Sequence, residues 1–184
     1  METSNPHQKN IHIITGGPAS GKTSLINALR KKGFKCFDEV AREVIKEQLA
    51  KKTDIVPWIK LAEFNTLVLE RQIKQHLDAN EELHFFDRGI PDNLAYLTNG
   101  NLPIHPALHE ASKKHRYNEK IFFLEPWKEI YKNDVVRKEP FEAAVKISAH
   151  IKQAYIDLGY SVIVVPKVSV KERVSFILEH VVSK

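Results

Sequence analysis

The sequence contains only one cysteine, and it contains no apolar run as long as a membrane-spanning helix requires. Cys36 therefore cannot form an internal disulfide, and its apolar neighbours favour a buried, inert thiol over a nucleophile. Residues 1–10 are polar and lack the apolar centre of a signal peptide. These absences lead us to expect a cytoplasmic protein that does not interact with a membrane.

The sequence also lacks internal repeats, low-complexity linkers and any metal-ligand spacing among its nine histidines. Its net charge is +5, but the basic residues are dispersed among 23 acidic ones instead of forming a tail. This dispersion favours a small polyanion such as a nucleotide as the partner and argues against a long nucleic-acid footprint. Because 184 residues suffice for one core, we expect a polar tail over residues 1–10 and a single domain over residues 11–184.

Glycine is scarce, with seven residues in the whole chain, yet three of the seven fall in one short stretch. That stretch matches the pattern G-x-x-x-x-G-K-[ST] in full. An apolar, β-branched segment over residues 11–15 precedes it, and residues 24–32 show the apolar spacing of a helix. We therefore expect a phosphate-binding loop between a strand and a helix. Its predicted nucleotide-binding residues are Gly16, Gly17, Pro18, Ala19, Ser20, Gly21, Lys22, Thr23 and Ser24.

The chemistry of this glycine loop follows from its residue types. Glycines permit the backbone turns that bring several N–H groups onto one anion at a helix N-terminus. Lys22 adds a positive charge for the β and γ phosphates of ATP, and the hydroxyl of Thr23 is a suitable ligand for Mg²⁺. We therefore expect ATP and Mg²⁺ to bind at this loop.

Two acids open the helix that follows a strand predicted over residues 33–38. Asp38 either caps this helix or binds the substrate at the carboxyl end of a parallel strand. Glu39 either complements the helix dipole or orients the phosphoryl acceptor. Arg42 lies one turn further along the same face, where it either reaches an anionic group or pairs with Glu39. We predict substrate-binding roles for all three residues and a catalytic role for Glu39.

A third acid ends a short apolar run over residues 83–87. Asp87 is predicted to bind Mg²⁺ together with Thr23, since an aspartate at the tip of a buried strand near such a loop is the usual second contact of the metal. The alternative is that Asp87 caps the turn before Pro91. The next residue is Arg88, where a motor ATPase of the AAA type commonly has a glutamate that orients water. We predict that Arg88 is a catalytic residue that balances charge.

A basic pair and two aromatic residues could have either a functional or a purely structural role. Arg137 belongs to a basic pair at the head of the helix after the fourth predicted strand, where small P-loop kinases have a lid. We predict that it stabilises the transferring phosphoryl group, the alternative being a solvated charge cluster. Trp58 and Phe64, in a helix predicted over residues 58–77, either line an acceptor pocket or pack in the core.

Strand-like and helical segments alternate along the whole chain. The predicted strands cover residues 11–15, 33–38, 83–87, 120–124 and 160–165. Such alternation requires parallel strands that are joined by right-handed crossovers and covered by helices. We predict an α/β fold, namely a three-layer P-loop NTPase fold with a five-stranded parallel sheet and helices on both faces.

Several ordered motifs resemble the AAA-domain family of predicted ATPases. These motifs are residues 15–18, 39–45, 86–92, 126–127 and 131–137, and the likeness spans residues 11–178. The family is similar to the kinase domain of the bifunctional ribosylnicotinamide kinase and to other P-loop nucleoside and nucleotide kinases. The resemblance implies nucleotide binding and the strand order 2-3-1-4-5. The chain departs from ring-forming motors because it lacks their extra helical domain, the Walker B glutamate and evident sensor motifs.

Together these features predict Mg²⁺-dependent transfer of the γ-phosphoryl of ATP to a small, nucleoside- or nucleotide-like acceptor. The expected catalytic residues are Lys22, Arg88, Arg137 and Glu39, and the expected metal ligands are Thr23 and Asp87. One alternative is an ATPase or an NTP-dependent regulatory switch without a small-molecule acceptor, although no acid follows Asp87 to orient water. Another is an enzyme that acts on nucleic acid, but the sequence shows no basic stripe.

Overall fold

The sheet fixes the arrangement of the whole molecule. A computed structural model describes residues 10–131 and 140–182. It contains five parallel strands in the order β2-β3-β1-β4-β5. The strands are β1 (Ile11–Gly16), β2 (Lys35–Phe37), β3 (His84–Asp87), β4 (Lys120–Leu124) and β5 (Ser161–Val164). The predicted fold and strand order are thus confirmed, and the central β1 ends between β3 and β4.

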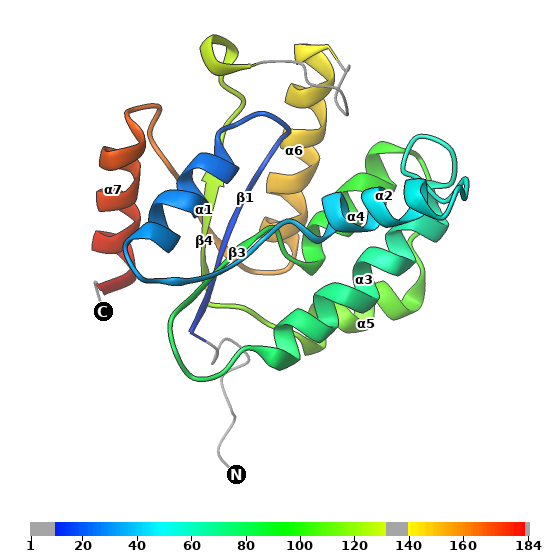
Figure 1. Cartoon of the computed structure of the whole chain (residues 1–184), viewed down its shortest axis with the longest axis horizontal. Coiled ribbons are helices and arrows are strands. Elements are labelled where there is room, and N and C mark those ends of the chain that lie inside the picture. Colours follow the sequence, from blue (N-terminus) through cyan, green and yellow to red (C-terminus); the bar gives the residue numbers. More distant parts are fainter. Residues whose placement is uncertain (1–9, 132–139, 183–184) are drawn as a thin grey trace.

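Helices cover both faces of this sheet. They are α1 (Lys22–Lys31), α2 (Val40–Ala50), α3 (Leu61–Asp78), α4 (Ile90–Asn99), α5 (Pro106–Lys114), α6 (Phe141–Asp157) and α7 (Val170–Val182), with a short 3₁₀ helix, η1 (Lys128–Ile130). Helices α1 and α7 pack together on one face, and α4 and α6 pack together on the other (Figure 1). Within residues 10–131 and 140–182, none of the helices combines the length and the apolar character that crossing a membrane demands.

The side chains of β1 alternate between the two faces. Ile11 and Ile13 belong to the core cluster that includes residues of α4 and α6. Ile14 belongs instead to the cluster that contains Leu25 of α1 and Ile177 of α7. Because both faces are covered, the strand is apolar almost throughout. Ligands of such sheets bind beyond the carboxyl ends of the strands, where β1 runs into the glycine loop.

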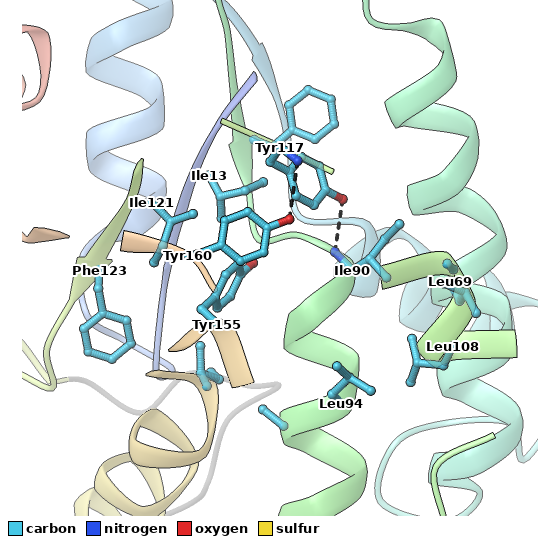
Figure 2. Packing of buried hydrophobic residues seen from close by; sticks show 14 of the residues in the cluster. Ile13, Leu69, Ile90, Leu94, Leu108, Tyr117, Ile121, Phe123, Tyr155 and Tyr160 are labelled. Atoms are coloured by element: carbon cyan, nitrogen blue, oxygen red, sulfur yellow. Dashed lines mark hydrogen bonds between the residues drawn. The ribbon is translucent and has the colours of Figure 1, made fainter. Parts of the chain in front are cut away.

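Three tyrosines fill the core between the sheet and the start of α4 (Figure 2). The backbone N–H of Ile90 donates a hydrogen bond to the hydroxyl of Tyr117 at 3.1 Å, and the N–H of Tyr117 donates to the hydroxyl of Tyr160 at 3.4 Å. Burial raises the pKa of Tyr117, Tyr155 and Tyr160 above its ordinary value, so all three stay neutral. These contacts fix the position at which α4 begins, directly after Arg88 and Gly89.

Helix α3 begins later than the sequence pattern predicts, at Leu61 instead of residue 58. The N–H groups of Ile59 and Lys60 both donate to the carbonyl oxygen of Val56, which closes a turn before the helix. Trp58 lies in this turn with 57% of its surface exposed. Phe64 is buried in a cluster with residues of α2 and α3, so it packs in the core.

The buried His12 should make the protein sensitive to acid. Its ring lies between Phe85 and Phe122, and only 2% of the residue is exposed. Burial lowers the pKa of His12 from 6.5 to about 4. As the pH falls below 6.5, His12 is therefore protonated in the unfolded chain, whereas in the folded protein it stays neutral until about pH 4. Folding stability should fall as the pH decreases through this window, by on the order of 3 kcal/mol at pH 4.

Denaturant unfolding of wild type and His12→Leu at several pH values measures this contribution. Since leucine cannot take up a proton, the variant should lose less stability than wild type between pH 6.5 and pH 4. His109→Leu is the matched control, because His109 is exposed on α5. If His12→Leu and wild type showed the same pH dependence, the burial of His12 would not be a source of acid sensitivity.

Candidate functional site

The glycine loop joins β1 to α1 at the carboxyl edge of the sheet. Gly16 has a φ angle of 141°, and a Cβ atom there would lie 2.1 Å from the carbonyl oxygen of Leu124 in β4. Gly21 has a φ angle of 87° and immediately precedes the first residue of α1. Both positions therefore require glycine. The first N–H groups of α1 have no partner within the helix, and the helix dipole favours an anion at this end.

The side chain of Lys22 folds back into the glycine loop. It is 4% exposed, and its Nζ donates to the carbonyl oxygens of Gly16 and Gly17 at 3.0 and 2.7 Å and to the hydroxyl of Ser20 at 3.3 Å. The loop thus encloses a buried positive charge. Phosphate oxygens are stronger acceptors for an ammonium group than neutral carbonyl oxygens, because the bond is then assisted by charge on both sides.

Asp87 lies beside this loop, at the end of β3 and directly opposite Ile14 of β1. It is 5% exposed, and its Oδ1 atom receives no hydrogen bond from any residue that the structure describes. Burial raises the pKa of Asp87 to about 6, although the nearby ammonium of Lys22 opposes the shift. A buried carboxylate oxygen without a donor suits a hard divalent cation. The exposed hydroxyl of Thr23, which lines the adjacent pocket, is a second oxygen of the kind that Mg²⁺ binds.

Arg88 connects three parts of the site. Its backbone has a φ angle of 72°, which is uncommon for any residue other than glycine. Its Nε donates to Oε1 of Glu39 at 3.0 Å, and its Nη1 donates to the carbonyl oxygen of Gly16 at 3.1 Å. Arg42 donates from Nε to the other oxygen of Glu39 at 3.1 Å. Two guanidinium groups therefore hold the Glu39 carboxylate at the start of α2. Arg42 pairs with Glu39, and its predicted role in substrate binding remains a prediction.

Asp92, in the first turn of α4, holds Arg88 from the other side. Its Oδ1 accepts hydrogen bonds from the hydroxyl of Thr15 at 2.6 Å and from Nη1 of Arg88 at 3.0 Å. Its Oδ2 accepts from the N–H of Gly89 at 3.0 Å and from the hydroxyl of Tyr155 at 2.7 Å. With 2% of its surface exposed, Asp92 is a buried anion with four donors. These bonds stabilise the positive φ angle of Arg88, which costs free energy on its own.

A pocket of about 380 Å³ opens next to the loop. It is lined by residues 19–24, Glu39, Ile130, Val170 and Arg173. This volume lies within the range of pockets that bind small ligands. A separate hollow of about 570 Å³ runs along α7, but its lining includes Glu172 and Glu179 and no residue of the glycine loop. We identify the first pocket as the candidate site, because it combines the helix N-terminus with buried cations.

The structure does not bring every predicted residue to this pocket. The carboxylate of Asp38 pairs with Nη2 of Arg30 at 2.7 Å, its side chain is 62% exposed, and it does not line the pocket. The lining also omits Trp58, Phe64, Arg42, Asp87 and Arg88. Arg137 lies outside the residues that the structure describes. The roles assigned to these residues, and those assigned to the other predicted site residues, remain predictions.

Sequence reasoning missed two residues of the site. Asp92 entered only as part of a family motif, although an acid three residues after a glycine that opens a helix indicates a capping interaction. Arg173 belongs to none of the motifs. It lies on the same face of α7 as the buried Val174 and Ile177, and a charged residue on an apolar helix face was the available signal.

Several solved structures share this fold. Deoxyadenosine kinase from M. mycoides, with dCMP and dCDP bound, is 14% identical with a TM-score of 0.64, covering 92% of this chain and 97% of that one. The NadR protein in complex with NR is 16% identical with a TM-score of 0.72, covering 97% of this chain and 52% of that one. Shikimate kinase from Aquifex aeolicus is 17% identical with a TM-score of 0.55, covering 92% and 94%. At such identities these likenesses show the fold alone.

The family assignment comes from the sequence as a whole. Among curated proteins, none matches this chain. A family model described as an AAA domain does match, and it spans residues 11–173. This span includes the glycine loop, Glu39, the Asp87–Arg88 pair and Asp92, so the match covers every described part of the site. The resemblance found in the motifs is confirmed, and the chain belongs to this AAA-domain family.

Proposed function

We propose that the protein is a Mg²⁺-dependent phosphotransferase that moves the γ-phosphoryl of ATP to a small, nucleoside- or nucleotide-like acceptor. One observation supports this function above all. The ammonium of Lys22, the unpartnered carboxylate oxygen of Asp87 and the anchored guanidinium of Arg88 lie together at the glycine loop. A triphosphate and a divalent cation are the ligands that such a set of charges complements. We propose that residues 11–184 form the single domain that performs this reaction.

The roles of the residues follow from their positions. The loop N–H groups and Lys22 would bind the β and γ phosphates, and Arg88 would balance charge as the phosphoryl group moves. A hydroxyl oxygen of the acceptor bonds to the γ phosphorus, the bond from that phosphorus to the bridging oxygen breaks, and ADP leaves. Glu39 would orient the hydroxyl and receive its proton late in the reaction. A late transfer needs no strong base, because the transition state is loose.

Thr23 and Asp87 would hold Mg²⁺, which when bound neutralises charge on the β and γ phosphates. The residues present fit this cation, since both ligands are oxygens and Mg²⁺ keeps most of its shell as water and phosphate oxygens. Arg42 would contact the acceptor near Glu39, and its side chain is 41% exposed and within reach of solvent. Asp38 and Arg137 remain proposed members of the acceptor site and the lid.

The nature of the acceptor is proposed from the fold relatives and from the family resemblance. The names of deoxyadenosine kinase and of the NR-bound NadR protein indicate that they act on or bind nucleoside-type molecules, whereas the name of shikimate kinase does not. Two of these three relatives therefore support a nucleoside-like acceptor. The ATPase alternative is less well supported, because Arg88 occupies the position where a water-orienting acid is needed, and its side chain already bonds to Glu39, Asp92 and Gly16.

Transfer of labelled phosphate tests this proposal. The protein is incubated with γ-labelled ATP and Mg²⁺, and with a panel of nucleosides, nucleotides, shikimate and DNA ends. Label on a nucleoside or nucleotide is the expected result, and it should disappear when EDTA removes the metal. Label released only as inorganic phosphate would overturn the proposal in favour of an ATPase. Tight nucleotide binding without any turnover would overturn it in favour of a switch.

A further inference from the structure

Arg173 on α7 is a buried cation whose hydrogen bonds are incomplete. The residue is 4% exposed, and its Nε and Nη1 atoms are buried without a hydrogen-bond partner among residues 10–131 and 140–182. Its guanidinium lies over the ring of Trp127, with 5.6 Å from Cζ to the ring centroid. Its Nη1 lies 2.8 Å from the position that a Cβ atom would occupy on Gly21. Arg173 thus packs directly against the glycine at the start of α1.

This arrangement is costly without a further ligand. Burying a guanidinium without acceptors loses its hydration and gains no hydrogen bonds in return. Its surroundings increase the cost, because the pocket also contains the ammonium of Lys22 and the positive end of the α1 dipole. Burial accordingly lowers the pKa of Arg173. An anion placed between these groups would compensate all three at once.

The missing partners also indicate which part of a nucleotide lies here. One face of the guanidinium already contacts Trp127. Stacking of a nucleobase on the opposite face would leave the N–H groups at the edge of the guanidinium without acceptors. Phosphate oxygens satisfy those edges, and arginine matches phosphate geometry with two parallel hydrogen bonds. Arg173 lines the pocket together with Thr23 and Ser24 in the first turn of α1.

We propose that Arg173 binds the phosphate chain of the nucleotide as a second cationic contact beside Lys22, with Trp127 holding the plane of its guanidinium. This inference shares one premise with the proposed function, namely that the nucleotide binds in the pocket. It does not depend on any phosphoryl acceptor. The inference gives a role in nucleotide binding to a residue that lies 151 positions after Lys22 in the chain. It also explains why a cation is buried at a site without a carboxylate bonded to it.

Calorimetry with ATP, ADP and adenosine tests the inference on the full chain. Arg173→Gln should weaken the binding of ATP and ADP by roughly 10- to 100-fold, the range for loss of a hydrogen bond to a charged group, and leave adenosine binding unchanged. Arg173→Lys should restore part of the affinity because the charge is kept. Lys171→Gln is the matched control, since Lys171 is exposed on the same helix. Unchanged ATP binding in Arg173→Gln would overturn the inference, and so would an equal loss for adenosine.

Thermal unfolding separates this role from a structural one. Arg173→Leu removes a buried charge, so the nucleotide-free variant should unfold at a higher temperature than wild type, while the stabilisation by added ATP should shrink. A purely structural arginine would give the opposite result, a lower unfolding temperature with an unchanged ATP effect. The proposed phosphotransferase function fails independently, if wild type binds ATP through Arg173 but transfers phosphate to no acceptor.

Discussion

Replacing Lys22 with alanine is expected to abolish phosphoryl transfer while the protein stays folded. The ammonium is a buried charge at the glycine loop, and a preorganised cation acts there in a medium where water does not screen it. Removing one such stabilising donor from an active site costs on the order of 10²- to 10³-fold in turnover. The loss should therefore appear mainly in kcat, with a smaller loss in the affinity for ATP.

The fold should survive this substitution, because the hydrogen bonds from Nζ of Lys22 to Gly16, Gly17 and Ser20 join residues of the loop itself. Circular dichroism and thermal unfolding measure the fold, and labelled phosphate on the acceptor measures turnover. Lys31→Ala, at the exposed end of the same helix, controls for a general effect of removing a charge from α1. Normal turnover in Lys22→Ala would contradict the role assigned to Lys22.

Replacing Asp87 with asparagine is expected to lower the rate of phosphoryl transfer and to raise the unfolding temperature of the protein. The variant should lose the dependence of nucleotide affinity on Mg²⁺ and most of its turnover, because a neutral amide is a weak ligand for a hard cation. At the same time it should unfold at a higher temperature in the absence of ligands. The wild-type carboxylate is buried with one oxygen unpartnered, and burial disfavours its charged form.

Two measurements on the same sample test this exchange. Calorimetry gives the affinity for ATP with Mg²⁺ and with EDTA, and a thermal scan gives the unfolding temperature. Asp78→Asn serves as control, since Asp78 is an exposed acid at the end of α3. If Asp87→Asn were less stable than wild type, the carboxylate would be a structural acceptor in the fold. If its Mg²⁺ dependence were intact, another residue would hold the metal.

The fold could be predicted from the sequence because its signals are local. Alternating apolar strands and helices indicated five parallel strands, and the ends of each lie within two residues of their expected places. The order of the strands was available only from the family resemblance, because periodicity contains no information on which strands pair. The start of α3 was wrong by three residues, since the turn at Val56 depends on hydrogen bonds that the pattern does not reveal.

Part of the candidate site was also predictable from local sequence, and part was not. The glycine loop is contiguous and follows from one motif, whereas the contacts that complete the site join distant residues. Arg88 and Glu39 are 49 positions apart, and Thr15 and Asp92 are 77 apart. Asp38 and Glu39 are neighbours in sequence, yet one bonds to Arg30 on α1 and the other faces the pocket. Composition and spacing cannot distinguish two adjacent acids that project in different directions.

The four hydrogen bonds of Asp92 limit the part that this carboxylate can take in the proposed reaction. A carboxylate offers about four acceptor directions, and each oxygen of Asp92 already receives two donors. An acceptor hydroxyl could approach it only by displacing one of them, which agrees with the proposal that Glu39 receives the proton. Since one of the four donors is Tyr155 of α6, a sideways displacement of that helix would pull on the same carboxylate that positions Arg88. The position of Arg88 in the candidate site is thereby coupled to the position of α6.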